Sequence, residues 1–166
     1  MKTTAILILI IIWSLISNAQ TQIPTGNVSG TWNKANSPYI IDGDITIPLG
    51  SNLVIESGVE ISASGSFYIN CNGTILAQGS EIDSIVFTVP HGIQFNSNTS
   101  TDSSKFSFCK FLNSGNSNGG RFWFNQSDKI IIKNSLFESN SATCRGGAIY
   151  CVESDIIIKD NEFRNN

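Results

Sequence analysis

The sequence predicts an all-β fold, a parallel solenoid with three short strands in each coil of 22–28 residues. Two stretches repeat one another at an offset of 26 residues, Ile130–Asn140 and Ile156–Asn166. A fixed period of roughly 20–50 residues is typical of solenoids. Apolar residues alternate within several strands, as Leu53 and Ile55 do, which predicts one inner and one outer face. After residue 20 there is no amphipathic helical period of useful length.

Composition narrows the class of protein. The chain has 166 residues and a formal net charge of −3, so it offers no basic surface and predicts no nucleic-acid partner. Charged residues make up 14% of the chain, while Gly, Asn, Ser and Thr are abundant, which suits many tight turns. β-branched and aromatic residues recur throughout, so a disordered chain is not expected.

Residues 1–19 have the pattern of a cleaved signal peptide. Lys2 precedes the apolar run Ala5–Ile16, and the small residues Ser17–Ala19 lead to an expected cut before Gln20. The apolar run is shorter than the roughly 20 residues that span a bilayer, so a membrane anchor is the weaker alternative. We therefore predict an exported mature chain without a transmembrane span.

The mature chain divides into two parts. Residues 20–38 form a polar lead-in, which we expect to cap the first coil because the terminal repeats of a solenoid are atypical. Residues 39–166 form the coils, and the doubled stretch at their end leads us to expect a chain that continues beyond Asn166. The first coils are a series of short strands separated by turns: 45–47, 53–56, 59–61, 67–71, 74–77 and 85–88.

The repeats predict internal ladders, because successive coils lie about 4.8 Å apart and place like residues on like residues. Ile61 to Ile85 and Ile69 to Ile93 are both 24 apart, and later coils settle at 26. Asparagines near the corners are expected to take left-handed backbone angles. The ladder residues are Phe111, Phe137, Phe163, Ile132, Ile158, Asn140 and Asn166, and the turn glycines are Gly119, Gly120, Gly146 and Gly147.

The four cysteines show no metal-binding spacing. Cys144 and Cys151 flank a segment that is expected to be extended, and at about 3.3 Å per residue they are too far apart for a disulfide. We expect Cys71, Cys109, Cys144 and Cys151 to be small buried hydrophobes in the stacked core.

These residues give the stretch from Tyr39 onward a resemblance to the right-handed parallel β-helix, or pectate-lyase-like, superfamily. Gly146–Ile149, together with Phe137–Asn140 and Phe163–Asn166, resembles the paired GGA(I/L) and FxxN repeats of polymorphic outer-membrane proteins. In the preceding coil Arg121 replaces the alanine and Ser114 the final asparagine. The resemblance implies a surface protein implicated in adhesion, secreted or on the outer surface of a Gram-negative bacterium.

Carbohydrate-cleaving enzymes share this architecture, so we considered catalytic residues. A lyase site would use Asp102, Asp128 and Asp155 to hold Ca²⁺, with Arg121 or Arg145 facing them, and Ca²⁺ takes six to eight oxygen ligands. The favoured interpretation is that these aspartates close turns and that the arginines are solvated corner residues.

A hydrolase would need paired carboxylates, for which Asp42 and Asp44 are candidates, although a turn role is favoured. His91 is the only histidine, and no Asp-Asp pair accompanies it, as a polygalacturonase-type motif would require. Trp123 and Tyr150 could stack on sugars, but inward-facing core positions are expected for both.

The sequence therefore predicts a non-catalytic, exported β-helical scaffold for adhesion or glycan contact, without a cofactor. Its expected partners are polysaccharides or cell-surface glycans. Two alternatives remain: a polysaccharide lyase or glycoside hydrolase, and a structural spacer of a longer secreted protein.

Overall fold

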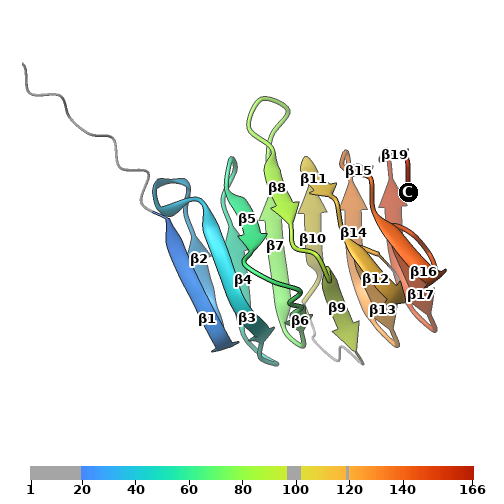
Figure 1. Cartoon of the computed structure of the whole chain (residues 1–166), viewed down its shortest axis with the longest axis horizontal. Coiled ribbons are helices and arrows are strands. Elements are labelled where there is room, and N and C mark those ends of the chain that lie inside the picture. Colours follow the sequence, from blue (N-terminus) through green and yellow to red (C-terminus); the bar gives the residue numbers. More distant parts are fainter. Residues whose placement is uncertain (1–19, 97–101, 119) are drawn as a thin grey trace, which may run out of the picture.

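The computed structural model describes residues 20–96, 102–118 and 120–166. The coils lie side by side along the long axis, from β1 at one end to β19 at the other (Figure 1). About five turns are present, and each strand pairing is parallel. The prediction of an all-β parallel solenoid is confirmed. The predicted signal peptide, residues 1–19, lies outside the described residues.

One side of the solenoid is a six-stranded sheet in the order β18-β14-β10-β7-β4-β2. Each coil contributes one strand to it, and the inward side chains of these strands are apolar in most coils. The strands are β2 (Gly30–Trp32), β4 (Asn52–Ile55), β7 (Thr74–Gln78), β10 (Ser104–Ser107), β14 (Asp128–Lys133) and β18 (Asp155–Lys159).

The remaining sides form an eleven-stranded sheet with two arms, because β3 (Tyr39–Ile47) pairs with both β5 and β6. β1 (Thr21–Asn27) lies on the other edge of β3. The first arm holds β5 (Glu60–Ala63), β8 (Ile85–Thr88), β11 (Cys109–Leu112), β15 (Leu136–Glu138) and β19 (Glu162–Arg164); the second arm holds β6 (Ile69–Cys71), β9 (Ile93–Asn96), β13 (Phe122–Asn125) and β17 (Ile149–Val152).

Two later coils contain a fourth strand. β12 (Gly115–Asn118) and β16 (Ser141–Arg145) pair with each other between the two arms. Three strands per coil is therefore the pattern of the earlier coils, and a fourth strand follows β11 and β15. Residues 20–38, expected as a lead-in, supply β1, β2 and the short 3-10 helix η1 (Lys34–Asn36).

The strand registers follow the sequence repeat. Phe111 pairs with Phe137, which pairs with Phe163, at the 26-residue spacing. Ile69 pairs with Ile93, but Ile61 pairs with Phe87 rather than with Ile85. A two-residue shift keeps the same side chains facing inward, so alternation alone does not distinguish the two registers.

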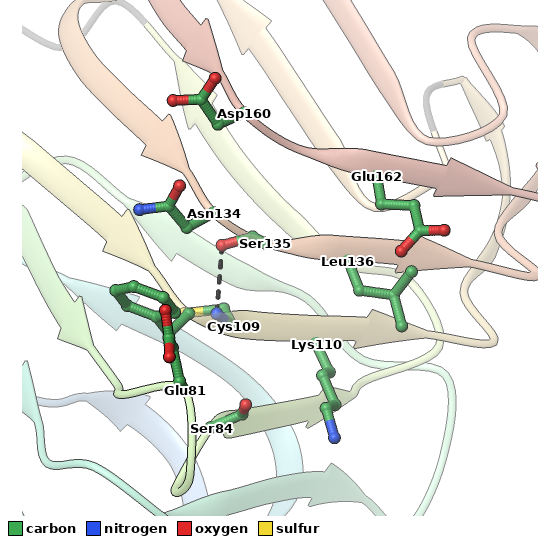
Figure 2. Close-up of a pocket in the computed structure, with 10 residues that line it drawn as sticks. Glu81, Ser84, Cys109, Lys110, Asn134, Ser135, Leu136, Asp160 and Glu162 are labelled. Atoms are coloured by element: carbon green, nitrogen blue, oxygen red, sulfur yellow. Dashed lines mark hydrogen bonds between the residues drawn. The ribbon is translucent and has the colours of Figure 1, made fainter.

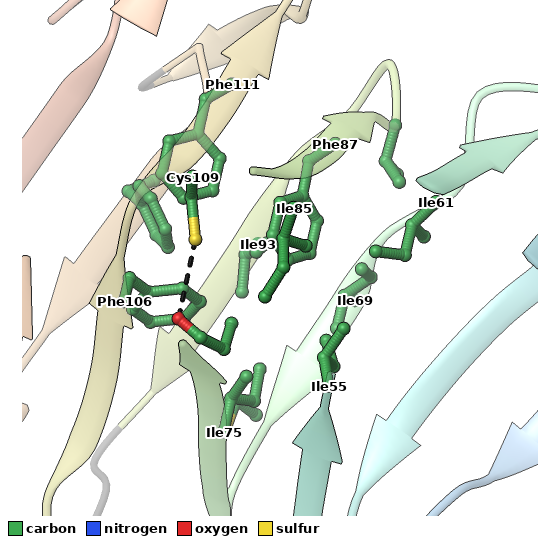
Figure 3. Packing of buried hydrophobic residues seen from close by; sticks show 14 of the residues in the cluster. Ile55, Ile61, Ile69, Ile75, Ile85, Phe87, Ile93, Phe106, Cys109 and Phe111 are labelled. Atoms are coloured by element: carbon green, nitrogen blue, oxygen red, sulfur yellow. Dashed lines mark hydrogen bonds between the residues drawn. The ribbon is translucent and has the colours of Figure 1, made fainter. Parts of the chain in front are cut away.

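The core changes character along the axis (Figure 3). Isoleucines predominate among the buried residues of the early coils, whereas phenylalanines predominate in the later ones. Phe87 stacks on Phe111 with ring centroids 5.1 Å apart, and Phe111 lies 4.8 Å from Phe137. Phe106 meets Phe111 edge-on at 5.9 Å. Such aromatic pairs contribute beyond the apolar area that they bury.

Candidate functional site

The interior ladders hold adjacent coils together. Phe137 stacks on Phe163 at 4.8 Å, and Phe163 is 48% exposed in the last described coil. Ile132 is fully buried and pairs with Ile158, which is 43% exposed. These side chains supply apolar packing to the core and bring no polar group to a surface.

Asn140 is a buried polar link between three coils. Its side-chain nitrogen donates to the carbonyl of Phe111 at 3.0 Å and to Oδ1 of Asn166 at 2.8 Å. Its Oδ1 accepts from the Ser114 hydroxyl at 2.8 Å. The left-handed angle expected at Asn140 and Asn166 falls one residue earlier, at Ser139 (φ 55) and Asn165 (φ 52). The two asparagines instead turn inward, where their amides satisfy main-chain groups of neighbouring coils.

Arg121 is fully buried, so the expectation of a solvated corner residue is wrong. Its guanidinium donates to the carbonyls of Val89 at 2.7 Å, Phe87 at 3.1 Å and Leu112 at 2.6 Å. Desolvation lowers the pKa of Arg121 to about 9. Arg121 satisfies these carbonyls from inside the core. It does not face the solvent, as a lyase arginine would.

The aspartates expected at strand starts do not assemble as a calcium site. Asp128 and Asp155 are in register, and Oδ1 of Asp128 accepts the Asp155 main-chain N–H at 3.0 Å. Asp102 is exposed. Among the described residues no group of three or more His, Cys, Asp or Glu side chains is placed to hold a metal ion. Asp128 therefore has a structural partner in the next coil.

The turn glycines lie where coils approach closely. A Cβ on Gly120 would collide with the carbonyl oxygen of Gly147, and Gly146 has a positive φ of 42°. A Cβ on Gly147 would come within 2.9 Å of the Asn166 main chain. Gly119 lies outside the described residues. The glycine pairs thus permit close stacking of main chains and carry no chemistry.

The hydrolase candidates also make contacts between coils. Asp44 accepts the main-chain N–H of Tyr68 at 2.9 Å, and Asp42 accepts the Ser64 hydroxyl. His91 packs against Tyr68 with ring centroids 4.6 Å apart. Both aspartates therefore hold the second coil against β3.

A surface hollow of about 390 Å³ lies at the corner between the six-stranded sheet and the first arm (Figure 2). Its carboxylates come from well-separated segments, Glu81 before β8 and Asp160 and Glu162 near β19. Glu162 accepts from Arg164 at 2.5 Å. The Ser135 hydroxyl at its floor accepts the Cys109 main-chain N–H at 3.1 Å. The hollow runs along the corner of the coils, and residues that line it, such as Ser135 and Glu162, make structural contacts.

The second arm carries a different surface on its outer side. One outward-facing residue from β3 and one from each strand of the second arm pair in register and form a column along the axis. All five are half-buried. Phe122 and Phe124 on either side of Trp123 are fully buried. The column runs Thr46, Asn70, Gln94, Trp123 and Tyr150.

This column corrects the expectation that Trp123 and Tyr150 face inward. Successive side chains of a strand point to opposite faces, so Trp123 must face away from the core that holds Phe122 and Phe124. The Phe-Trp-Phe alternation in the sequence predicts the outward position of Trp123 if the two phenylalanines are assigned to the core. Trp123 and Tyr150 meet edge-on at 6.3 Å.

Arg145 completes this outer cluster. Its Nη1 donates to the Tyr150 hydroxyl at 2.6 Å, and its guanidinium carbon lies 5.3 Å from the centre of the Tyr150 ring. Arg145 is exposed at the end of β16, beside the second arm. We call Trp123, Tyr150 and Arg145 the aromatic–arginine cluster. It joins flat apolar rings to one cation on the outer face, and sequence reasoning did not bring the three together.

The cysteines divide into two classes, and none forms a disulfide. Cys71 and Cys109 are buried, as expected, whereas Cys144 and Cys151 are exposed, contrary to expectation. Cys151 pairs in register with the buried Phe124 and lies in the last described strand of its arm, where no further coil covers it. Cys144 lies in β16, outside the core.

Comparison with known families identifies one segment of the chain. Residues 134–152 match the family described as the Chlamydia polymorphic membrane protein (Chlamydia_PMP) repeat. The segment runs from the corner before β15 to the end of β17 and includes the last Gly-Gly pair. Neither the curated proteins nor the solved structures gave a match. The chain is thus a parallel β-helix that carries repeats similar to those of polymorphic membrane proteins.

Proposed function

We propose that this chain is an exported, non-catalytic surface protein of a Gram-negative bacterium whose solenoid presents its second arm to glycans. The matched repeat, which is described as that of a polymorphic membrane protein, supports a place at the bacterial surface or outer membrane. Within the part of the chain that the structure describes, no helix is long and apolar enough to cross a bilayer.

The observation that carries the proposal is the outer column of the second arm. Trp123 and Tyr150 offer apolar ring surface, to which Tyr150 adds a hydroxyl group, and such rings bury area at little conformational cost. Asn70 and Gln94 continue the column with side-chain amides, which both donate to and accept from hydroxyl groups. The residues recur about every 4.8 Å along the axis, so they could contact successive units of an extended polymer.

The core also explains why a solenoid suits this task. Each coil is stacked on the last by main-chain hydrogen bonds and interior ladders, so the outer face is rigid before any ligand arrives. Rigid contact residues lose little entropy on binding. A glycan-binding surface needs no catalytic group, and the candidate acids Asp42, Asp44 and Asp128 already have structural partners.

The proposal is tested by screening the purified chain on a glycan array and measuring Kd for the strongest ligands. We expect Trp123→Ala to weaken binding at least tenfold, because aromatic anchors commonly dominate interfaces. Leu136→Ala, on the outer side of the first arm, serves as the matched control and should bind normally. Circular dichroism and thermal unfolding verify that each variant is folded.

Two results would overturn the proposal. If no glycan binds, the spacer interpretation gains support. If the chain degrades an acidic polymer such as polygalacturonate with Ca²⁺, releasing unsaturated product, the lyase alternative replaces the scaffold. Unchanged glycan binding by Trp123→Ala would show that the binding face does not lie on the second arm.

A further inference from the structure

We infer that the aromatic–arginine cluster selects sugars that bear a carboxylate, with Arg145 as the group that binds the negative charge. The inference rests on the proposed glycan-binding function and adds the chemical class of the ligand. Two features support it: the contacts of Arg145 and the absence of an acidic partner for it among the described residues.

Tyr150 holds the Arg145 guanidinium in place. The hydroxyl accepts one N–H at 2.6 Å, and the ring lies beneath the guanidinium at 5.3 Å. A guanidinium has five N–H donors in a planar fork, so one hydrogen bond leaves the others available. The brace reduces the freedom of a long side chain before binding, which lowers the entropic cost of a contact with a ligand.

Arg145 makes no ion pair with any described residue, unlike Arg164 and Lys34. Arg164 pairs with Glu162 at 2.5 Å, and Lys34 pairs with Asp83 at 2.6 Å. Glu153, the acid that follows β17, accepts from Gln126 at 3.0 Å. The guanidinium fork is therefore available for a carboxylate, which it binds bidentately.

The chain as a whole would repel an acidic ligand, because its formal net charge is −3. A preference for acidic sugars could not arise from a general positive field. It would have to come from a local contact, and Arg145 is the cation placed beside Trp123 and Tyr150. The rings then contact the sugar and the guanidinium binds its carboxylate.

The inference is tested with matched glycan pairs that differ in the acidic group: sialylated against asialo oligosaccharides, and uronic-acid oligomers against their carboxyl-reduced forms. The wild-type chain should bind the acidic member about tenfold more tightly, as expected for a hydrogen bond to a charged group. The preference should shrink as NaCl is raised, because the site is exposed. The two sets of pairs show which acidic sugar is bound.

Variants separate this inference from the proposed function. Arg145→Met should bind the two members of each pair with equal affinity and should still bind the neutral member. Tyr150→Phe should reduce the preference for the acidic member, because it removes the hydroxyl that holds Arg145. Arg164→Met, an arginine on the first arm, is the control and should retain the preference. Equal binding of both members by the wild-type chain, or an unchanged preference in Arg145→Met, would overturn the inference and leave glycan binding intact. Binding to neither member would instead contradict the proposed function.

Discussion

The early and late coils of this solenoid turn their corners in different ways. In residues 20–96 the described positive φ angles belong to glycines, among them Gly50 (φ 76), Gly58 (φ 74) and Gly92 (φ 82). In residues 102–166 most of them belong to residues with side chains, and they recur along the repeat. These are Phe108, Asn113, Gln126, Lys129, Asn134, Ser139, Glu153, Asp160 and Asn165.

The comparison shows how corners without glycine are stabilised. A left-handed angle costs an ordinary residue roughly 1–2 kcal/mol. Beside these corners, buried or half-buried side chains donate across coils, as Asn140 does to Phe111 and Asn161 does to Ile132 at 2.8 Å. Net hydrogen bonds of about 1 kcal/mol each are of the size needed to offset that cost. The early coils place glycine at their corners instead.

The largest effect is expected from the late core. Phe111→Ala should lower the free energy of unfolding by about 3–5 kcal/mol, because it leaves a cavity among Phe87, Phe137 and Phe106. Urea denaturation of the purified chain measures the loss. The early member of the same column, Ile61, should tolerate Ile61→Val at a cost of about 0.5–1.5 kcal/mol.

Phe163→Ala is the matched control within the ladder. Phe163 is 48% exposed, so its truncation should cost much less than that of the fully buried Phe111. Equal losses for the two variants would mean that the ladder does not set the stability of the late coils.

A smaller effect is expected at the junction of the two regions. Arg121→Met keeps much of the side-chain volume but deprives the carbonyls of Phe87, Val89 and Leu112 of their donor. Each unsatisfied buried group costs about 1–3 kcal/mol, and removal of a desolvated charge offsets part of this. We expect a net loss of about 2 kcal/mol by urea denaturation. Arg145→Met, at the surface, should change stability little, and a fully stable Arg121→Met would show that the guanidinium is not needed at the junction.

The repeat in the sequence was sufficient to predict the fold class and much of the register. Phe111, Phe137 and Phe163 are identical residues at a constant offset, and stacking of like residues is what a parallel coil requires. The predicted register was wrong at Ile61 because Ile85 and Phe87 both face inward. Apolar identity alone does not choose between them.

The polar features were less accessible from the sequence. Whether an arginine is buried depends on which carbonyls lack a partner, and two of those that Arg121 satisfies, on Phe87 and Val89, lie 34 and 32 residues earlier in the chain. The outward position of Trp123 follows from the face that Phe122 and Phe124 occupy. The pairing of Arg145 with Tyr150 depends on the path between β16 and β17, which the repeat does not specify.

The last prediction concerns the reactivity of the cysteine thiols. It is the smallest effect because it involves no change in the stability of the fold. Each region buries one cysteine: burial raises the pKa of Cys71 to about 12 and raises that of Cys109 further. Because the thiolate is the reactive form, neither should react with iodoacetamide at pH 8 in the folded chain. Cys144 should react first and Cys151 more slowly, since partial burial raises its pKa. Mass spectrometry should find two labels in the native chain and four in urea. Labelling of Cys109 but not of Cys71 in the native chain would show that the late coils open more readily than the early ones.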